Sequence, residues 1–241
     1  MSLPLAVVGC GKMGRLVEQF APEYGFAVCA RFSKCNIASL SPESLHGATL
    51  AIEFTSPAAA PGNLRRLAAL GVNIVCGTTG WYEDMPQIRG VIADARTALV
   101  FGANFSVGVN LFFDVVARAS ALIAQHPEYE AWGWEIHHSA KKDAPSGTLK
   151  KLAEEIRHSG FTGSLTLSSN RAGAHTGTHE IGFDSSADTI TLRHTARNRE
   201  GYARGALQAA RWIVGKKGVF EFREILADLP TSGVPGMSAA G

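Results

Sequence analysis

Proton-donating side chains gather in one short stretch of the chain, from Glu135 to Thr148. It reads Glu-Ile-His-His-Ser-Ala-Lys-Lys-Asp-Ala-Pro-Ser-Gly-Thr. An unperturbed imidazole, with a pKa of roughly 6.5, suits general acid catalysis at neutral pH. Lys141 can donate a proton or hold a carboxylate. The segment therefore predicts a small acidic substrate that takes up a proton during the reaction.

The end of this segment predicts an anion site. Pro145 favours an extended residue before it, and the apolar spacing over 146–157 is helical. A helix that begins here offers N–H groups, hydroxyls and the positive end of its dipole to a carboxylate. We expect Ser146 to cap the helix, and Ser146, Gly147 and Thr148 to contact the anion.

His137 and His138 follow an extended run, so their side chains are predicted to lie on opposite faces. One imidazole then reaches the reaction centre, while the other contacts a different part of the ligand or packs. Paired histidines could also bind zinc, but no cysteine or third acidic ligand recurs at a suitable spacing, so we expect no metal. The neighbouring Lys142 is expected to be solvated.

A glycine-rich turn near the N-terminus predicts a dinucleotide. It follows an apolar strand pattern at 5–8 and opens a helical one. In such turns the first glycine permits the tight bend, the second lets a pyrophosphate approach the backbone, and the third lets helix and strand pack. Alternatively, the glycines only close a strand–helix turn. The candidate cofactor-binding residues are Gly9, Cys10, Gly11, Lys12, Met13 and Gly14.

The second predicted strand ends without a carboxylate. In NAD-binding domains an acidic residue about 20 residues beyond the turn binds the ribose hydroxyls. Arg31, Ser33 and Lys34 stand in this region instead, and they could bind a 2′-phosphate. The alternative is that the two cations are ordinary surface residues. We favour NADPH over NADH as the cofactor.

Two further loops follow predicted strands, at 77–80 and 102–106. Both consist mainly of small residues, which would let the backbone approach the nicotinamide ribose and ring. Taken alone, each could also be a simple turn. The candidates in these loops are Gly77, Thr78, Thr79, Gly102, Ala103, Asn104 and Phe105.

Apolar strands alternate with helical patterns through the first hundred residues. This alternation is typical of a parallel sheet covered on both faces, so we expect an α/β, Rossmann-like doubly wound domain. The strands are expected at 5–8, 26–30, 48–54, 72–75 and 98–101, and the helices at 57–70 and 84–96.

The pattern then changes to a long helix and clustered strands, which favours a smaller α+β domain with a mixed or antiparallel sheet. The helix is expected to include Val109–Ile123, the strands to cover 132–138, 178–184 and 189–195, and a final helix to cover 203–214. The expected domains are 1–106 with 200–229 for the dinucleotide and 107–199 for the substrate. Residues 230–241 are expected to form a flexible tail.

Composition excludes some classes of protein. A formal net charge of +2 gives no argument for a nucleic-acid or membrane partner. No apolar run approaches the roughly 20 residues that span a bilayer. The four cysteines show no CxxC pair, so we expect reduced, mostly buried thiols in a cytoplasmic protein.

From about residue 5 to 226 the sequence resembles the 4-hydroxy-tetrahydrodipicolinate reductase (dihydrodipicolinate reductase) family. The most specific match is Glu-x-His-His-x-x-Lys-x-Asp-Ala-Pro-Ser-Gly-Thr. Supporting matches are Gly77-Thr-Thr-Gly80, Asn104-Phe-Ser-Val-Gly-Val-Asn110, Arg171-x-Gly173 with Gly177-x-His179, and His194-x-Ala196-x-x-Arg199-x-x-Tyr202-Ala-x-Gly205-Ala206.

The resemblance implies that His137 is the general acid/base and Lys141 the proton donor, while His138, Gly147 and Thr148 hold substrate carboxylate. It also implies a hinged two-domain subunit and a homotetramer built through the sheet of the second domain. Hydride delivery to a conjugated cyclic imine leaves an electron-rich carbon that takes up a proton, and a nearby cation would serve this step.

The chain departs from the family pattern at the glycine turn, which is one residue shorter than in many members. It also has Glu53-Phe54 where Asp-Phe is usual, and it lacks the acid that often follows the second strand. The alternatives are another Rossmann-type dehydrogenase of aspartate-derived metabolites, or a regulator that binds NADPH without turnover.

Overall fold

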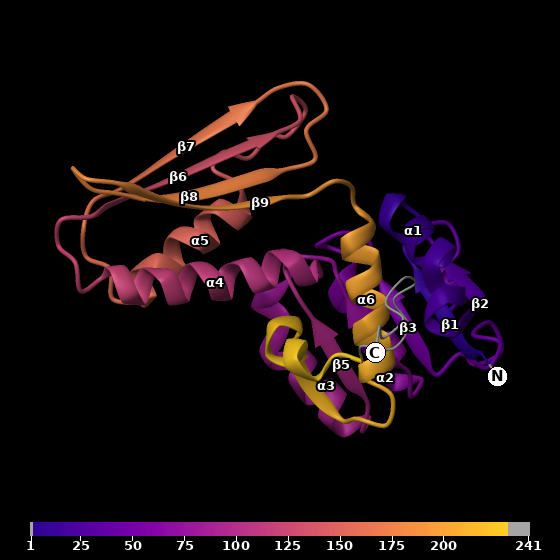
Figure 1. Cartoon of the computed structure of the whole chain (residues 1–241). Helices are drawn as coiled ribbons and strands as arrows, with labels where there is room; N and C mark the ends of the chain where they lie inside the picture. Colours follow the sequence, from indigo (N-terminus) through magenta and orange to yellow (C-terminus); the bar gives the residue numbers. More distant parts are fainter. Residues whose placement is uncertain (1, 231–241) are drawn as a thin grey trace, which may run out of the picture. The chain divides into compact units, whose positions relative to one another are not determined.

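The computed structural model describes residues 2–230, which fall into two compact units (Figure 1). One unit holds the residues up to Val107 and those from Glu200 on, and the other holds Gly108–Arg199. Of the predicted flexible tail, 231–241 lies outside the described residues. No helix among the described residues is long and apolar enough to cross a membrane.

The first unit is built on a six-stranded, fully parallel sheet. This confirms the predicted doubly wound α/β class. In order across the sheet the strands are β2 (Phe26–Phe32), β1 (Leu3–Val8), β3 (Leu50–Glu53), β4 (Asn73–Cys76), β5 (Ala98–Phe101) and β10 (Gly218–Glu221).

Helices cover both faces of this sheet because successive residues of its buried strands point to opposite sides. In β1, Leu5 and Val7 join one core, and Ala6 and Val8 join the other. The helices α1 (Lys12–Phe20) and α6 (Glu200–Trp212) pack on the first side, and α2 (Ala60–Ala69) and α3 (Met85–Asp94) on the second. Short 3₁₀ turns lie at Ala21–Tyr24, Ile37–Ser39, Tyr82–Asp84 and Phe222–Asp228.

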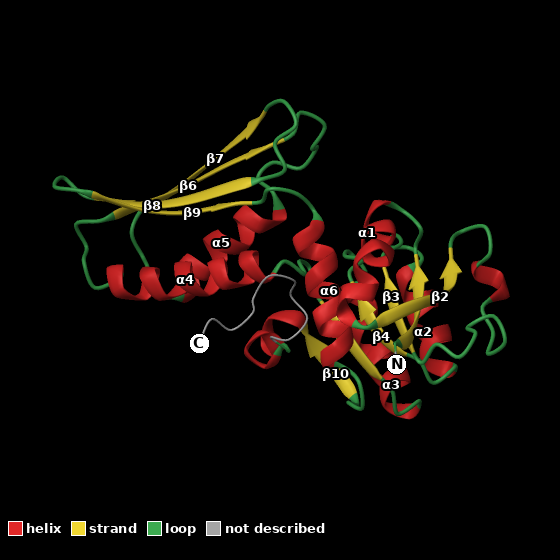
Figure 2. Ribbon diagram, turned by 45° about the vertical axis from the view of Figure 1, so that its right-hand side comes forward, coloured by secondary structure: helices red, strands yellow, loops and turns green. Residues whose placement is uncertain are grey.

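The direction of chain progression reverses at β1, which lies between β2 and β3. In open parallel sheets, ligands bind beyond the carboxyl ends of the strands at such a reversal. The glycine turn follows β1 directly and leads into α1, the helix labelled beside the strands of this sheet in Figure 2. Topology therefore places it at the expected position for a dinucleotide.

The second unit carries a four-stranded mixed sheet in the order β7 (Leu165–Arg171), β6 (Glu130–His137), β8 (Thr178–Asp184) and β9 (Thr189–Thr195). The β6–β7 pair is parallel, joined through α5 (Gly147–His158), and the other pairs are antiparallel. Residues of α4 (Val107–Ile123) and α5 share one core with the sheet. The predicted α+β organisation is confirmed.

The helix-facing side of this sheet is apolar over part of its length and polar towards the end of β6. Leu167, Gly133, Ile181 and Leu192 are partners across the four strands and lie in or beside the core. Two residues further along β6, the equivalent row is Ser169, Glu135, His179 and His194. The pairing of strands thus gathers buried (Glu135, His179) and half-buried (Ser169, His194) polar side chains from separate parts of the sequence.

Two strands were not predicted from the sequence. In β7 only Leu165 and Leu167 carry an apolar strand pattern, because the strand continues into the polar row. The other, β10, has only four residues and pairs along a single edge of β5. Neither strand is long or apolar enough to give a clear periodic signal.

Candidate active site

The glycine turn after β1 is shaped so that its first and third glycines cannot carry a side chain. A Cβ on Gly9, which has φ +103°, would lie 2.0 Å from the carbonyl oxygen of Phe54. A Cβ on Gly14 would lie 1.9 Å from the carbonyl oxygen of Gly9. Around Gly11 the space is open, and this residue caps α1 without a side-chain hydrogen bond. The helix N-terminus is therefore free to receive a phosphate.

The end of β2 shows how the predicted 2′-phosphate residues are arranged. Arg31 is bound to Glu18 of α1, with 2.8 Å between Nε and Oε1. Ser33 donates from its backbone N–H and its hydroxyl to Oδ1 of Asn36, over 2.7 and 3.2 Å. Lys34 is exposed. The turn is thus held by its own side chains, and Arg31 has a carboxylate partner that sequence reasoning missed.

The loop after β4 lies against the loop after β3. A Cβ on Gly77 would come within 1.9 Å of a ring atom of Phe54, so only glycine fits there. The hydroxyl of Thr78 accepts from the backbone N–H of Thr55 over 2.7 Å, and Thr78 is buried. Thr79 is exposed. Thr78 therefore holds the loop, and the next residue is the accessible one.

The loop after β5 contains one core residue among the cofactor candidates. The side chain of Phe105 is buried against Phe222, with 4.6 Å between the ring centroids. Only its backbone can contact a ligand. Asn104 accepts from the backbone N–H of Ser106 over 2.8 Å, and Ala103 is exposed.

The buried carboxylate of Glu135 is the centre of the second unit's polar cluster. Its Oε1 accepts from the backbone N–H of Ser146 over 2.9 Å, from the hydroxyl of Ser169 over 2.8 Å, and from Nη2 of Arg171 over 2.9 Å. Burial opposes ionisation, but the interaction with His179 and the hydrogen bonds from Ser146 and Arg171 outweigh it. They lower the pKa of Glu135 well below its usual range.

His137, the last residue of β6, lies on the helix-facing side of the sheet next to this carboxylate. Its Nδ1 is 3.6 Å from Oε2 of Glu135, and its ring is 5.0 Å from that of His179, edge to face. Burial and the neighbouring His179 lower the pKa of His137 to about 4, against the raising effect of Glu135. The ring is therefore neutral at neutral pH in the protein without ligand.

The predicted cap of α5 is confirmed: Oγ of Ser146 accepts from the backbone N–H of Leu149 over 3.2 Å. The same oxygen lies 3.2 Å from Nε2 of His179. Ser146 was also expected to contact an anion. Its backbone N–H donates to Oε1 of Glu135 instead, so this donor is not available to an anion. Exposed Gly147 and half-buried Thr148 begin the helix and retain that possibility.

The cations of the segment differ in their surroundings. Lys141 is paired with Asp143, with 2.7 Å between Nζ and Oδ1, and its side chain is 24% exposed. Pairing with Lys141 lowers the pKa of Asp143. Lys142 is exposed, as expected for a solvated side chain, and His138 is half-buried just beyond β6. Of the two adjacent lysines, Lys141 is therefore the one whose ammonium group is fixed by an ion pair.

The fold supplies a third ligand-type residue that sequence spacing did not reveal. One ligand atom each from Glu135, His137 and His179 lies within 4.8 Å of the others. The prediction of no metal rested on the absence of such a residue near the histidine pair, and His179 comes from a different strand. The guanidinium of Arg171 is already bonded to the same carboxylate.

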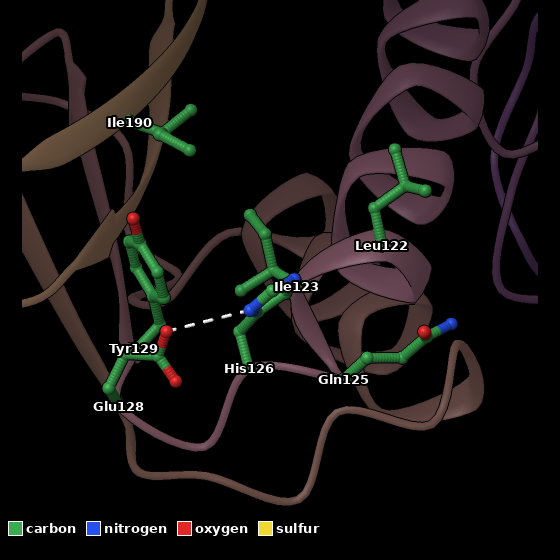
Figure 3. A pocket seen from close by; sticks show the side chains of 7 residues that line it. All are labelled: Leu122, Ile123, Gln125, His126, Glu128, Tyr129 and Ile190. Carbon is green, nitrogen blue, oxygen red and sulfur yellow. Dashed lines mark ion pairs between the residues drawn. The ribbon is translucent and has the colours of Figure 1, made fainter.

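A pocket elsewhere in the second unit is lined by apolar and polar residues at the end of α4, in the segment that follows it and on β9 (Figure 3). Nδ1 of His126 and Oε1 of Glu128 are 3.5 Å apart at its rim. Tyr129 precedes the first residue of β6, whereas His137 is its last, so roughly 25 Å of extended chain separates them. The pocket contains none of the predicted site residues: it is lined by Leu122, Ile123, Gln125, His126, Glu128, Tyr129 and Ile190.

The expectation of mostly buried cysteines was wrong. Cys76 is buried in the sheet, but Cys10 and Cys35 are exposed and Cys29 is half-buried. The exposed pair lie in the turns that follow β1 and β2, where the chain leaves the core. All four are free thiols.

The comparisons with known proteins agree over nearly the whole chain. The family model described as dihydrodipicolinate reductase, N-terminus, matches residues 3–105, and the one described as dihydrodipicolinate reductase, C-terminus, matches residues 108–226. The 4-hydroxy-tetrahydrodipicolinate reductase of Christiangramia forsetii is 30% identical over 238 residues, which cover 93% of this chain and 98% of the relative. That of Methanoregula boonei is 33% identical, over 83% of this chain and 80% of the relative.

Solved structures share the fold. The dipicolinate-bound dihydrodipicolinate reductase from Paenisporosarcina sp. TG-14 matches with a TM-score of 0.75 at 22% identity, over 93% of this chain and all of that one (100%). An amine dehydrogenase from Mycobacterium smegmatis matches with a TM-score of 0.61 at 11% identity, over 96% and 97%. The architecture thus occurs in enzymes with different activities, so the side chains of the site must decide the chemistry.

Proposed function

Because this chain belongs to the dihydrodipicolinate reductase family, we propose that it reduces 4-hydroxy-tetrahydrodipicolinate (dihydrodipicolinate) to tetrahydrodipicolinate in diaminopimelate and lysine biosynthesis. The observation that carries the proposal is the buried cluster of the second unit. There His137, at the end of β6, lies beside Glu135 and His179. The segment that defines the resemblance also supplies Lys141, which is paired with Asp143, and the start of α5.

The cofactor in this proposal is a reduced nicotinamide dinucleotide, which supplies the hydride when bound. The first unit fits it: the turn at Gly9 and Gly14 has no room for side chains, and the N-terminus of α1 is uncapped by any side chain. We favour NADPH over NADH because β2 is followed by Ser33 and exposed Lys34 rather than by a carboxylate. Arg31 would have to exchange Glu18 for the 2′-phosphate.

Proton delivery is assigned to Lys141 and His137. The ammonium of Lys141 carries a proton and a positive charge, and Asp143 limits where it can reach. His137 is neutral without ligand because of its lowered pKa of about 4. A bound dicarboxylate brings negative charge towards the ring and favours its protonated form. Lys141 then gives its proton to the carbon that becomes electron-rich after hydride addition, and the positive charge of protonated His137 stabilises that carbon as the charge develops.

Substrate carboxylate is assigned to the start of α5 and to His138. The N–H groups of Gly147 and Thr148 belong to the first turn of the helix, where they have no helical partner and the dipole is positive. Ser146 contributes by holding this turn through its cap and its bond to Glu135.

The assembly that we propose is a homotetramer formed through the second sheet. Both helices of that unit lie against one side of the sheet, and the other side presents half-buried Trp132, Trp134 and Ile136 of β6. A Trp134→Glu variant should shift the molar mass measured by light scattering to that of a smaller species. An unchanged mass at micromolar concentration would contradict this interface. The free thiols suit a reducing compartment such as the cytoplasm.

The experiment that tests the function supplies freshly made condensation product of pyruvate and aspartate semialdehyde. Loss of the near-ultraviolet absorbance of the reduced nicotinamide is followed with NADPH and with NADH. We expect substrate-dependent loss for the wild type, faster at low NADPH than at low NADH, and strong impairment in His137→Ala and Lys141→Ala. No loss with either cofactor would contradict the function, and full activity in both variants would contradict the assigned roles.

A further inference from the structure

One buried carboxylate contacts both halves of the proposed substrate site. Oε1 of Glu135 accepts from the backbone N–H of Ser146, which begins the carboxylate-binding turn. Its Oε2 lies 3.6 Å from Nδ1 of His137 and 3.4 Å from Nε2 of His179. The side chain is fully buried, at 0% exposure. The two oxygens of one group therefore face the acid and the anion site separately.

The surroundings keep this group charged and fixed. Ser169 and Arg171, both from β7, donate to Oε1. These donors occupy the lone pairs on one oxygen and leave the other for the two rings. Among the described residues, Oε2 of Glu135 and Nδ1 of His137 are both buried without a hydrogen-bond partner. Two unsatisfied buried polar atoms that face each other favour a closer contact when the site is occupied.

The opposite side of the His137 ring is bounded by Gly177. A Cβ at that position would lie 2.9 Å from Nε2, and the glycine has φ +147°. The ring is thus set between a carboxylate at Nδ1 and bare backbone at Nε2. This arrangement fixes which nitrogen is oriented by the protein and which one is left for a ligand.

The same three side chains could instead hold a metal ion, since their ligand atoms lie within 4.8 Å of one another. However, Nη2 of Arg171 is 2.9 Å from Oε1 of Glu135, so a cation already neutralises this carboxylate. A divalent ion would meet that positive charge directly. The observations favour an orienting role for the carboxylate.

We propose that Glu135 is the positioning residue of this site, which orients His137 through Oε2 and holds the carboxylate-binding turn through Oε1. The inference rests on the proposed function and gives a role to a residue that has none in the proposed proton delivery or carboxylate binding. The charged and titratable groups that face His137 are Glu135 on its own strand, His179 on β8, Arg171 on β7 and Lys141 in the following loop. Glu135 is the negative charge among them.

Two variants separate the two contacts. Glu135→Gln keeps an oxygen that can accept from Ser146 but removes the negative charge. Glu135→Asp keeps the charge but shortens the side chain, so the bond to the turn is lost. Glu155→Gln on α5 is the matched control, because this glutamate is also buried, in the same unit, and pairs with Lys151 at 3.3 Å outside the cluster.

The readouts are the pH profile of kcat and the dissociation constant of dipicolinate, used as an unreactive dicarboxylate probe. For Glu135→Gln we expect kcat at pH 7 to fall at least ~10-fold. We also expect the alkaline limb of the pH profile of kcat to shift to lower pH. Both follow because protonated His137 loses its negative neighbour. Dipicolinate affinity should stay within about 3-fold, since the turn keeps its acceptor. For Glu135→Asp we expect dipicolinate to bind about 10-fold more weakly, with the pH profile retained.

A folded Glu135→Gln protein with wild-type kcat and pH profile would overturn the proposal, as would full dipicolinate affinity in Glu135→Asp. Loss of activity in EDTA that returns with zinc alone would replace it by a metal site. Folding is checked by circular dichroism and by the thermal midpoint. If Glu135→Gln does not fold, the carboxyl ¹³C shift of Glu135 in the wild type is followed against pH by NMR. The proposal requires Glu135 to stay ionised over the pH range in which His137 titrates. A Glu135 that takes up a proton in that range would overturn it.

Wild-type turnover is measured first, so the inference and the function fail separately. An inactive wild type contradicts the proposed function. An active wild type together with unaffected Glu135 variants contradicts only the positioning role.

Discussion

Arg31 on β2 and Glu18 on α1 form an ion pair at the edge of the first unit, with 2.8 Å between Nε and Oε1. Their hydrogen bond lowers the pKa of Glu18 and raises the pKa of Arg31. Both side chains remain almost half exposed. The pair therefore competes with any 2′-phosphate that Arg31 would bind.

Glu18→Gln should release Arg31 and lower the KM for NADPH by ~2- to 5-fold, because an exposed pair of this kind contributes up to about 1 kcal/mol. The KM for NADH, which has no 2′-phosphate, should hardly change. The control is Glu23→Gln, which breaks the pair with Arg204 on the same unit. Steady-state kinetics with both cofactors measure the effect. Equal shifts for NADPH and NADH would show that Arg31 does not bind the 2′-phosphate.

Lys141 and Lys142 are adjacent lysines with different surroundings, and they make a matched pair of substitutions. Removing the held ammonium in Lys141→Ala should reduce kcat about 100-fold or more, the usual range for a lost proton donor. Lys142→Ala should leave kcat within about 2-fold, since its side chain is exposed. Both are measured at saturating NADPH. Similar losses in the two variants would mean that general positive charge, rather than a placed donor, supports the reaction.

Acid should destabilise the second unit through His137. Its folded pKa is lowered to about 4 from an ordinary value of 6.5, so the unfolded chain binds the proton more readily. The contribution to stability is therefore complete above pH 6.5 and is lost as pH falls towards 4, by about 3 kcal/mol at most. Denaturant unfolding at pH 7, 5 and 4 measures it.

His137→Gln should flatten this dependence, whereas replacing exposed His126 should not. His194 also has a lowered pKa because of burial and His179, so part of the slope should remain. A wild-type free energy of unfolding that does not fall between pH 6.5 and 4 would contradict the neutral, buried state of His137.

Gly177→Ala should impair catalysis more than it impairs folding. The new methyl group would lie 2.9 Å from Nε2 of His137 and push the ring out of place; a shift of about 1 Å can cost on the order of 100-fold in rate. The control is Gly160→Ala, which also has a left-handed φ (+88°) but an open environment. Comparing kcat with the thermal midpoint separates the effects. Equal activity losses in both variants would point to backbone strain alone.

Sequence predicted the architecture well because the strands of the first unit are apolar runs between helical patterns. It also predicted the cap at Ser146, which the structure confirms. The roles of His137 and Lys141, from the same segment, remain predictions. It gave no role to Glu135, although strand alternation puts that residue on the same face as His137.

The cluster as a whole could not be read from spacing, because register creates it. Ser169 and His179 are partners of Glu135 across the two neighbouring strands, and Arg171 is the partner of His137. One of those strands, β7, was not predicted at all. Likewise, Glu18 meets Arg31 only when α1 packs beside β2, and Phe105 proved to be a core residue because Phe222 returns from the far end of the chain.

The most direct test of the proposed reduction follows the hydride itself. Wild-type protein is supplied with NADPH that carries deuterium at the transferable position and with freshly made condensation product of pyruvate and aspartate semialdehyde. We expect tetrahydrodipicolinate that contains deuterium, detected by mass spectrometry, and its formation should be blocked by dipicolinate. Unlabelled product, or consumption of cofactor without any tetrahydrodipicolinate, would contradict it.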